Sequence, residues 1–290
     1  MTLFDAVVLG LVEGITEYLP VSSTGHLILA SSLLGLTEDE GSKRAVDAFN
    51  VVIQGGAILA VLGLYWKRVV QMLRGLIGKD AAGLKLASHL IVAFIPAAAL
   101  GKLLHDTIKE ELFSPGPVVA ALAVGGVWML LLDRRDRRLA AAGHEESGLT
   151  IETMTWKHAL GVGLFQVVAM WPGTSRSMMT IAGGTMLGLR RKEAAEFSFL
   201  LGLPTLGAAC VYDLYKDWSH ARETGGATMF ETLGMTSVIV GMLVAALSAA
   251  VAVRWLVSFL TRHGLGVFGW YRIALAIVMG ALLWGGVVTL

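Results

Sequence analysis

The segment Glu13-Gly-Ile-Thr-Glu-Tyr-Leu-Pro-Val-Ser-Ser-Thr-Gly-His26 lies in the middle of an apolar stretch, Leu3–Leu36. A second polar segment, Gln166-Val-Val-Ala-Met-Trp-Pro-Gly-Thr-Ser-Arg-Ser177, interrupts another apolar stretch, Ala159–Leu189. Each segment has a Glu or Gln, a proline six or seven residues later, and a turn rich in serine and threonine. Because proline removes a backbone N–H and disfavours helix at the preceding residue, each stretch is predicted to break into two short helices.

The composition around these segments is that of a membrane protein. Of the 290 residues, 55% are hydrophobic and 16% are charged, whereas a soluble domain has about 45–50% apolar and about 25% charged residues. The charges are too few to cover a water-soluble surface, and the chain is too hydrophobic to be disordered. The net charge of +1 excludes a protein that binds nucleic acid through an overall excess of positive charge. The single cysteine, Cys210, excludes a disulfide scaffold.

Six further stretches contain no Asp, Glu, Lys or Arg and approach the ~20 residues that a membrane-spanning helix needs. They are Ala48–Trp66, Leu86–Gly101, Leu112–Leu132, Phe197–Tyr212, Thr232–Val253 and Ile273–Leu290. Of the 23 lysines and arginines, 16 fall in one set of alternating loops and six in the other, and Arg272 is counted with the 16. Positive charge marks the cytoplasmic side, so residues 67–85 and 133–158 are predicted to be cytoplasmic and both termini to lie outside.

The two interrupted stretches are predicted to be re-entrant hairpins, because full crossings would break the alternation of charge. Irregular backbone at membrane depth is tolerated where it is buried in protein or lines a polar cavity. Each half of the chain would hold one hairpin and three spans, so the second half would be inverted relative to the first. We therefore expect one all-α polytopic membrane domain, residues 1–290, with six transmembrane helices plus two re-entrant helical hairpins. Its inverted-topology repeat halves, 1–135 and 155–290, would be joined by a basic cytoplasmic loop.

Four ionisable side chains lie inside the predicted hairpins: Glu13, Glu17, His26 and Arg176. Such a group costs at least ~2.5–3.5 kcal/mol inside a membrane and indicates a functional site. Glu13 and Glu17 are four residues apart and share a helix face, which suits divalent-cation binding or acid–base chemistry. The alternative is that they line a wet hairpin surface. For His26, the alternative is a packed, hydrogen-bonded side chain.

The turn at Pro172–Ser177 combines Arg176, the hydroxyls of Ser175 and Ser177, and the N-terminus of the returning helix. A guanidinium, backbone N–H groups and the helix dipole together favour an anion, most naturally phosphate. The alternative is a structural ion pair between Arg176 and Glu13 or Glu17. That pair would also bring the two hairpins together.

With these motifs, the sequence resembles the bacterial undecaprenyl-diphosphate phosphatases of the UppP/BacA family. The resemblance runs from Leu9 to Arg272, and its most specific parts are Glu13–His26 and Trp171–Ser177 with Thr180. It implies an enzyme of the bacterial cytoplasmic (inner) membrane that dephosphorylates a polyprenyl diphosphate lipid, yielding the monophosphate and inorganic phosphate. This reaction recycles the carrier lipid for peptidoglycan and other envelope glycans. The resemblance also implies bacitracin resistance on overproduction and a divalent cation, Mg²⁺ or Ca²⁺.

The matched motifs give the site residues expected roles. Glu17, with Glu13, would hold the cation. Arg176 would hold the terminal phosphate and act in catalysis. His26 is the first choice for direct participation, as nucleophile or base, and Ser23 is the alternative nucleophile. The other expected phosphate-binding residues are hydroxyl-bearing: Ser22, Thr24, Ser175, Ser177 and Thr180.

A transporter or flippase of polyprenyl phosphate lipids is the alternative function, because inverted repeats with broken helices are typical of secondary transporters. The N-terminal hairpin enters from outside in the predicted topology, so the site is expected to open to the outer, periplasmic face. The sequence leaves the chain length of the substrate open. It also leaves homodimer packing open, since the 35 glycines offer close-packing faces.

Overall fold

The computed structural model describes residues 1–36, 40–112, 114–142 and 148–286, and this part of the chain is helical apart from one isolated β-bridge between Leu149 and Leu189. Its elements in chain order are α1 (Leu3–Thr16), α2 (Ser23–Leu33), α3 (Glu40–Leu64), α4 (Trp66–Leu76), α5 (Ala81–Thr107), the π-helical turn η1 (Ile108–Leu112), α6 (Pro115–Ala141), α7 (Trp156–Val168), α8 (Arg176–Met186), α9 (Arg191–Thr224), α10 (Met229–Leu233), α11 (Met235–His263) and α12 (Gly266–Trp284). The all-α fold class is therefore confirmed for the described residues.

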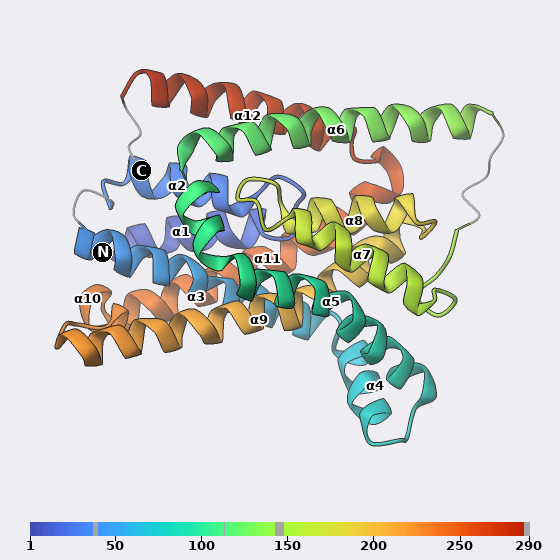
Figure 1. Ribbon diagram of the computed structural model, residues 1–290, viewed down its shortest axis with the longest axis horizontal. Coiled ribbons are helices and arrows are strands. Elements are labelled where there is room, and N and C mark those ends of the chain that lie inside the picture. Colours follow the sequence, from blue (N-terminus) through green and yellow to red (C-terminus); the bar gives the residue numbers. More distant parts are fainter. Residues whose placement is uncertain (37–39, 113, 143–147, 287–290) are drawn as a thin grey trace.

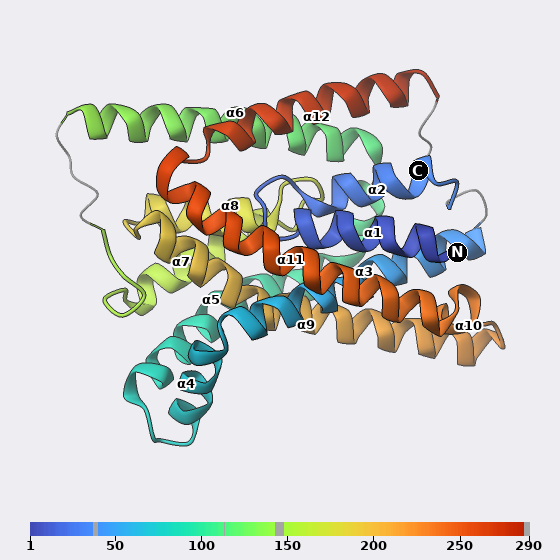
Figure 2. The ribbon, with the colours of Figure 1, turned by 180° about the vertical axis from the view of Figure 1, so that it is seen from behind.

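Six helices in the described part of the chain are long and apolar enough to cross a membrane: α3, α5, α6, α9, α11 and α12. Each overlaps one of the six predicted spans, so the prediction of a multi-pass membrane protein is confirmed. The N-terminus, α10 and the C-terminal end of α12 lie at one end of the molecule (Figures 1 and 2). The helix α4 and the C-terminal end of α6 lie at the opposite end.

Both interrupted stretches form pairs of short helices, as predicted. Residues 17–22 join α1 to α2, and residues 169–175 join α7 to α8. The α1–α2 pair opens toward the end of the molecule that holds the N-terminus, and the α7–α8 pair opens toward the other end (Figure 1). The two connecting turns therefore meet in the interior.

The first helix of each pair packs against a long helix from the other half of the chain. Helix α1 packs on α11, and α7 packs on α5, while α6 pairs with α12 and α3 with α9. Glycines allow the close approach: a Cβ on Gly14 would collide with the carbonyl oxygen of Ala245, and one on Gly163 with that of Ala93. Small residues of this kind let helix backbones touch. Each turn is thus held in place by helices from both halves.

The structure corrects one prediction of the charge count, which places Arg272 in a cytoplasmic loop. The charge-free run begins at Ile273 only because Arg272 interrupts it, whereas α12 begins at Gly266. Arg272 therefore lies inside a candidate span, and its side chain is 0% exposed. Gly125 of α6 leaves room for it, since a Cβ there would lie 2.5 Å from Nη2 of Arg272.

An ion-pair network fastens α4 to the rest of the molecule. Arg68 donates to Glu196 of α9 at 2.7 Å and to Glu152 at 2.7 Å. The hydrogen bond from Arg68 lowers the pKa of Glu152 below its usual value. The contribution of this pair is thus fully present above the ordinary carboxyl pKa of about 4.3 and is lost as the pH falls through the lowered value.

Replacing Arg68 with alanine is expected to lower the free energy of unfolding by about 1–3 kcal/mol, because it leaves the Glu196 carboxylate without its partner. The Glu196 side chain is only 12% exposed, so water replaces the lost bond poorly. Unfolding of the purified protein in detergent measures the change. Arg74→Ala, on the exposed face of α4, is the matched control. Equal stability of the Arg68 variant and the wild type would contradict the role of this network.

Candidate functional site

The two turns inside the helix pairs have matching backbone conformations. Ser22 and Ser175 are the only described non-glycine residues with positive φ, at 73° and 75°. Each is the N-cap of the helix that follows: the Ser22 hydroxyl accepts the N–H of Gly25, and the Ser175 hydroxyl accepts that of Met178. Side chains rarely adopt this backbone region, and strain of order 1–3 kcal/mol is retained chiefly at functional sites. The paired strain therefore marks both turns as parts of a site.

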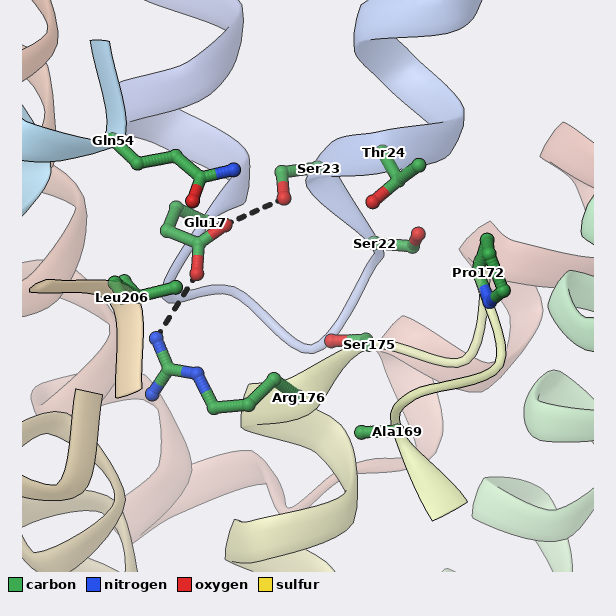
Figure 3. A pocket seen from close by; sticks show the side chains of 11 residues that line it. Glu17, Ser22, Ser23, Thr24, Gln54, Ala169, Pro172, Ser175, Arg176 and Leu206 are labelled. Atoms are coloured by element: carbon green, nitrogen blue, oxygen red, sulfur yellow. Dashed lines mark hydrogen bonds and ion pairs between the residues drawn. The ribbon is translucent and has the colours of Figure 1, made fainter. Parts of the chain in front are cut away.

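A cavity of about 130 Å³ lies between the two turns (Figure 3). A water molecule occupies about 30 Å³ in the liquid, so a group the size of a phosphate fits. The starts of α2 and α8 both border the cavity, and helix N-termini offer N–H groups and partial positive charge to an anion. The lining residues are Glu17, Ser22, Ser23, Thr24, Gln54, Ala169, Pro172, Gly173, Ser175, Arg176 and Leu206.

A hydrogen-bonded chain crosses the cavity from one turn to the other. The Ser23 hydroxyl donates to Oε2 of Glu17 at 2.6 Å, and Nη2 of Arg176 donates to Oε1 of Glu17 at 3.0 Å. Figure 3 shows Glu17 between the two partners. One carboxylate oxygen thus faces the serine hydroxyl while the other is held by the guanidinium. Glu17 is oriented to accept a proton from Ser23.

Arg176 is fixed on several sides and still has donors to spare. Its Nη1 donates to the carbonyl of Ser198 at 2.9 Å, and its Cζ lies 5.2 Å from the centroid of the Tyr18 ring. Gly202 leaves space for it, since a Cβ there would lie 3.0 Å from Nη1. Its Nε has no partner among the described residues. Because a guanidinium carries five N–H donors, the ion pair with Glu17 and phosphate binding are compatible.

His26 does not line the cavity. Its Nδ1 lies 2.7 Å from the carbonyl oxygen of Ser22, and its Nε2 lies 2.7 Å from the Tyr271 hydroxyl. The carbonyl can only accept, so Nδ1 carries the hydrogen and Nε2 accepts from Tyr271. The two rings also stack, with centroids 5.6 Å apart. Both nitrogens of His26 are therefore engaged in holding the first turn.

Of the residues expected to bind phosphate, Ser177 and Thr180 lie behind the cavity rather than on its wall. Ser177 donates to the carbonyl of Leu19 at 2.9 Å, which ties the second turn to the first. Thr180 donates to the carbonyl of Arg176 at 2.8 Å, and its hydroxyl lies 2.6 Å from that of Ser198. Thr180 thus supports the position of Arg176, both directly and through Ser198, which accepts from Arg176. The other expected residues line the cavity: Ser22, Thr24, Ser175 and Arg176.

Glu13 is fully buried, and neither of its carboxylate oxygens has a partner among the described residues. Among the described residues, no three His, Cys, Asp or Glu side chains lie close enough together to hold a metal ion by themselves. Mg²⁺ is often held by one or two carboxylates together with substrate phosphates and water. Glu17 lines the cavity, and Glu13 lies one turn earlier on α1, off the cavity wall. The pair therefore fits a cation that Glu17 shares with a phosphorylated substrate and Glu13 contacts from behind.

Sequence reasoning missed three residues that shape the site. Gln54 of α3 lines the cavity, while Tyr271 and Arg272 of α12 reach the turns from outside it. A polar side chain within a hydrophobic stretch could have pointed to Gln54, which lies within Ala48–Trp66. Arg272 also lies among hydrophobic residues, but the count of loop charges assigned it to a loop.

Comparison with known proteins gives extensive matches. Residues 6–278 match the family model described as "Bacitracin resistance protein BacA". The chain is 46% identical over 287 residues to Undecaprenyl-diphosphatase 2 of Rhodospirillum rubrum, covering 99% of this chain and 97% of that protein. It is 44% identical over 272 residues to the Undecaprenyl-diphosphatase of Sorangium cellulosum, covering 94% and 83% of the two chains. It is 42% identical over 288 residues to that of Nitrosomonas europaea, covering 99% and 97%. The family match includes every residue that lines the cavity.

Proposed function

The chain belongs to the BacA family, and we propose that it is an undecaprenyl-diphosphatase whose active site is the cavity between the two turns. It would hydrolyse undecaprenyl diphosphate to undecaprenyl phosphate and inorganic phosphate, and so return the carrier lipid to envelope synthesis. The family's association with bacitracin resistance accords with this reaction. The observation that carries the assignment is the hydrogen-bonded series Ser23–Glu17–Arg176, which lies where the N-termini of α2 and α8 meet.

In the proposed first step, the Ser23 oxygen attacks the terminal phosphorus. Its proton passes to Glu17, the bond from that phosphorus to the bridging oxygen breaks, and undecaprenyl phosphate leaves with the bonding electrons. In the second step, water attacks the phosphoserine, Glu17 returns its proton to the Ser23 oxygen, and inorganic phosphate departs as H₂PO₄⁻. The 2.6 Å contact between Ser23 and Glu17 supports this assignment of nucleophile and base.

Arg176 supplies charge stabilisation in this proposal. Phosphoryl transfer depends mainly on positioning and on donors aimed at the equatorial oxygens. Arg176 is held by Glu17 and Ser198, so its free N–H groups are already oriented. The hydroxyls of Thr24 and Ser175 and the N–H groups at the starts of α2 and α8 add further donors on the cavity wall.

His26 takes a positioning role in the proposed mechanism, and Ser23 takes the nucleophilic role for which His26 was the first expectation. The support is that Ser23 lines the cavity, whereas His26 is held between Ser22 and Tyr271 outside it. The cation, Mg²⁺ or Ca²⁺, is proposed to be held by Glu13 and Glu17 together with diphosphate oxygens. When bound, it would neutralise charge on the diphosphate.

We further propose that both helix pairs are re-entrant hairpins and that residues 1–135 and 155–290 form an inverted repeat, joined by a basic cytoplasmic loop of which residues 143–147 lie outside the described residues. The matching conformations of Ser22 and Ser175 support this arrangement, as does the interleaved packing of α1 with α11 and of α7 with α5. The proposed orientation in the bacterial inner membrane has both termini outside and the site open to the periplasmic face. The loop charges support that orientation.

Cysteine accessibility tests the orientation. In a Cys210→Ala background, Lys43→Cys is expected to react with a membrane-impermeant thiol reagent applied from outside, because it follows the first hairpin. Lys79→Cys, in the exposed connection between α4 and α5, is the matched position that should be protected. Labelling of position 79 alone from outside would reverse the proposed orientation.

Phosphate release by the purified protein in detergent, with farnesyl diphosphate or a longer polyprenyl diphosphate, tests the proposed reaction. Hydrolysis does not need a sealed bilayer, whereas flipping of a lipid does. Release of inorganic phosphate is therefore expected. If no phosphate is released but a phosphorylated lipid is moved across sealed vesicles, the alternative of a transporter or flippase is correct.

A further inference from the structure

We propose that Tyr271 and Arg272, two adjacent residues of α12, position both strained turns of the active site. The inference rests on the proposed function. Neither side chain lines the cavity, so both are positioning residues rather than catalytic ones. Helix α12 packs against α6, and from it Tyr271 contacts His26 and Arg272 contacts Gly173 of the second turn.

Arg272 holds the second turn. Its Nη2 donates to the carbonyl oxygen of Gly173 at 2.8 Å and to that of Ala121 on α6 at 3.0 Å. Gly173 has a φ of +92°, and it lies two residues before the strained Ser175. A Cβ on Gly173 would lie 3.1 Å from that of Ala121, so the turn is pressed against α6. The guanidinium thus joins the turn, α6 and α12.

Tyr271 holds the first turn through His26. The Tyr271 hydroxyl donates to Nε2 of His26, and Nδ1 of His26 donates to the carbonyl of Ser22, the other strained residue. The side chain of Ser22 caps α2, and the next residue is Ser23, the proposed nucleophile. A substitution at Tyr271 would therefore displace Ser23 indirectly, through His26 and the carbonyl of Ser22.

The burial of Arg272 adds an electrostatic argument. Its Nε and Nη1 have no partner among the described residues, and no carboxylate in that part of the chain pairs with it. A buried cation without a counter-charge is costly to keep. Two backbone carbonyls, those of Gly173 and Ala121, take the place of a counter-charge. The protein thus keeps a costly buried arginine at the point where it fixes the turn that borders the cavity.

The prediction is a loss of turnover with little loss of substrate binding. A misplacement of about 1 Å at a reacting centre can cost on the order of 100-fold in rate, so Arg272→Met is expected to lower kcat about 100-fold with KM changed less than about threefold. Arg272→Lys keeps the charge and one donor group and should recover at least about tenfold of that loss. Thermal unfolding in detergent identifies the folded variants.

Gly125→Ala provides a second route that leaves Arg272 in place. The added Cβ would lie 2.5 Å from Nη2 of Arg272, so the guanidinium must move and kcat should fall. Gly280→Ala, on α12, is the matched control because its nearest neighbour would be 4.0 Å away. It should turn over at the wild-type rate. If both Gly125→Ala and Arg272→Met fold and keep kcat within about threefold of wild type, the role of Arg272 is refuted.

A double-mutant cycle tests the Tyr271 arm. If Tyr271 acts through His26, then Tyr271→Phe with His26→Gln will be no slower than His26→Gln alone. Independent, multiplying effects would overturn this arm of the inference. These outcomes are separate from a failure of the proposed function, because they presuppose that the wild-type protein releases phosphate. A wild type that releases none would refute the function itself.

Discussion

Ser23→Ala is expected to lower kcat for polyprenyl diphosphate hydrolysis by about 10⁴–10⁶-fold, as removal of an activated serine nucleophile does in other hydrolases. The Ser23 hydroxyl is the one hydroxyl on the cavity wall that donates to a described carboxylate, at 2.6 Å from Glu17. Without it, the terminal phosphorus has no attacking oxygen already paired with a base. Phosphate release in detergent measures the loss.

The matched control is Ser32→Ala on the same helix, α2, where the side chain has no part in the cavity. It should retain the wild-type kcat. Because alanine at position 23 removes only one small polar group, the variant is also expected to fold. A Ser23→Ala protein that turns over within about tenfold of wild type, beside an inactive His26→Ala protein, would return the nucleophilic role to His26.

Arg176→Ala is expected to lower kcat/KM by about 10³–10⁵-fold, the range found when a guanidinium that stabilises a transferring phosphoryl group is lost. Two causes act together: the phosphate loses its donors, and Glu17 loses the partner that orients it. Arg176→Lys should restore little, because a point charge cannot replace the planar fork held between Glu17 and Ser198. Steady-state kinetics in detergent measure both variants.

A double variant separates phosphate binding from a purely structural ion pair. Glu17→Gln with Arg176→Met removes both charges, so the stability lost in Arg176→Met alone should return. Activity should stay absent. If activity returned together with stability, the pair would be structural and the proposed role of Arg176 would be wrong. Arg190→Ala, an exposed arginine just before α9, is the control for loss of positive charge.

Much of the architecture could be predicted because the signals were local. Proline within an apolar run predicted both broken helices, and charge-free runs predicted all six candidate spans. The ion pair between Arg176 and Glu17 was also open to prediction, since few partners exist for a charge inside a membrane. These features depend on residue type and short spacing, which a sequence shows directly.

The remainder depended on contacts between distant parts of the chain. Ser23 and His26 lie three residues apart, and only the packing of α12, which brings Tyr271 onto His26, shows which of them faces the cavity. The sequence prediction puts Arg272 in a loop because it treats a charged residue within a hydrophobic stretch as the boundary of that stretch. The glycine at position 125, which makes room for that side chain, is 147 residues away along the chain.

The most direct test of the central claim is to trap the phosphorylated enzyme. The protein is mixed with farnesyl diphosphate labelled in its terminal phosphate, quenched within the first turnover under acid and under alkaline conditions, and mapped by mass spectrometry. Phosphoserine survives acid, whereas phosphohistidine does not, so the two quenches distinguish them. The proposed mechanism predicts an acid-stable phosphate on Ser23 that is absent from Ser23→Ala. An acid-labile phosphate on His26, or turnover with no covalent phosphate on any residue, would contradict it.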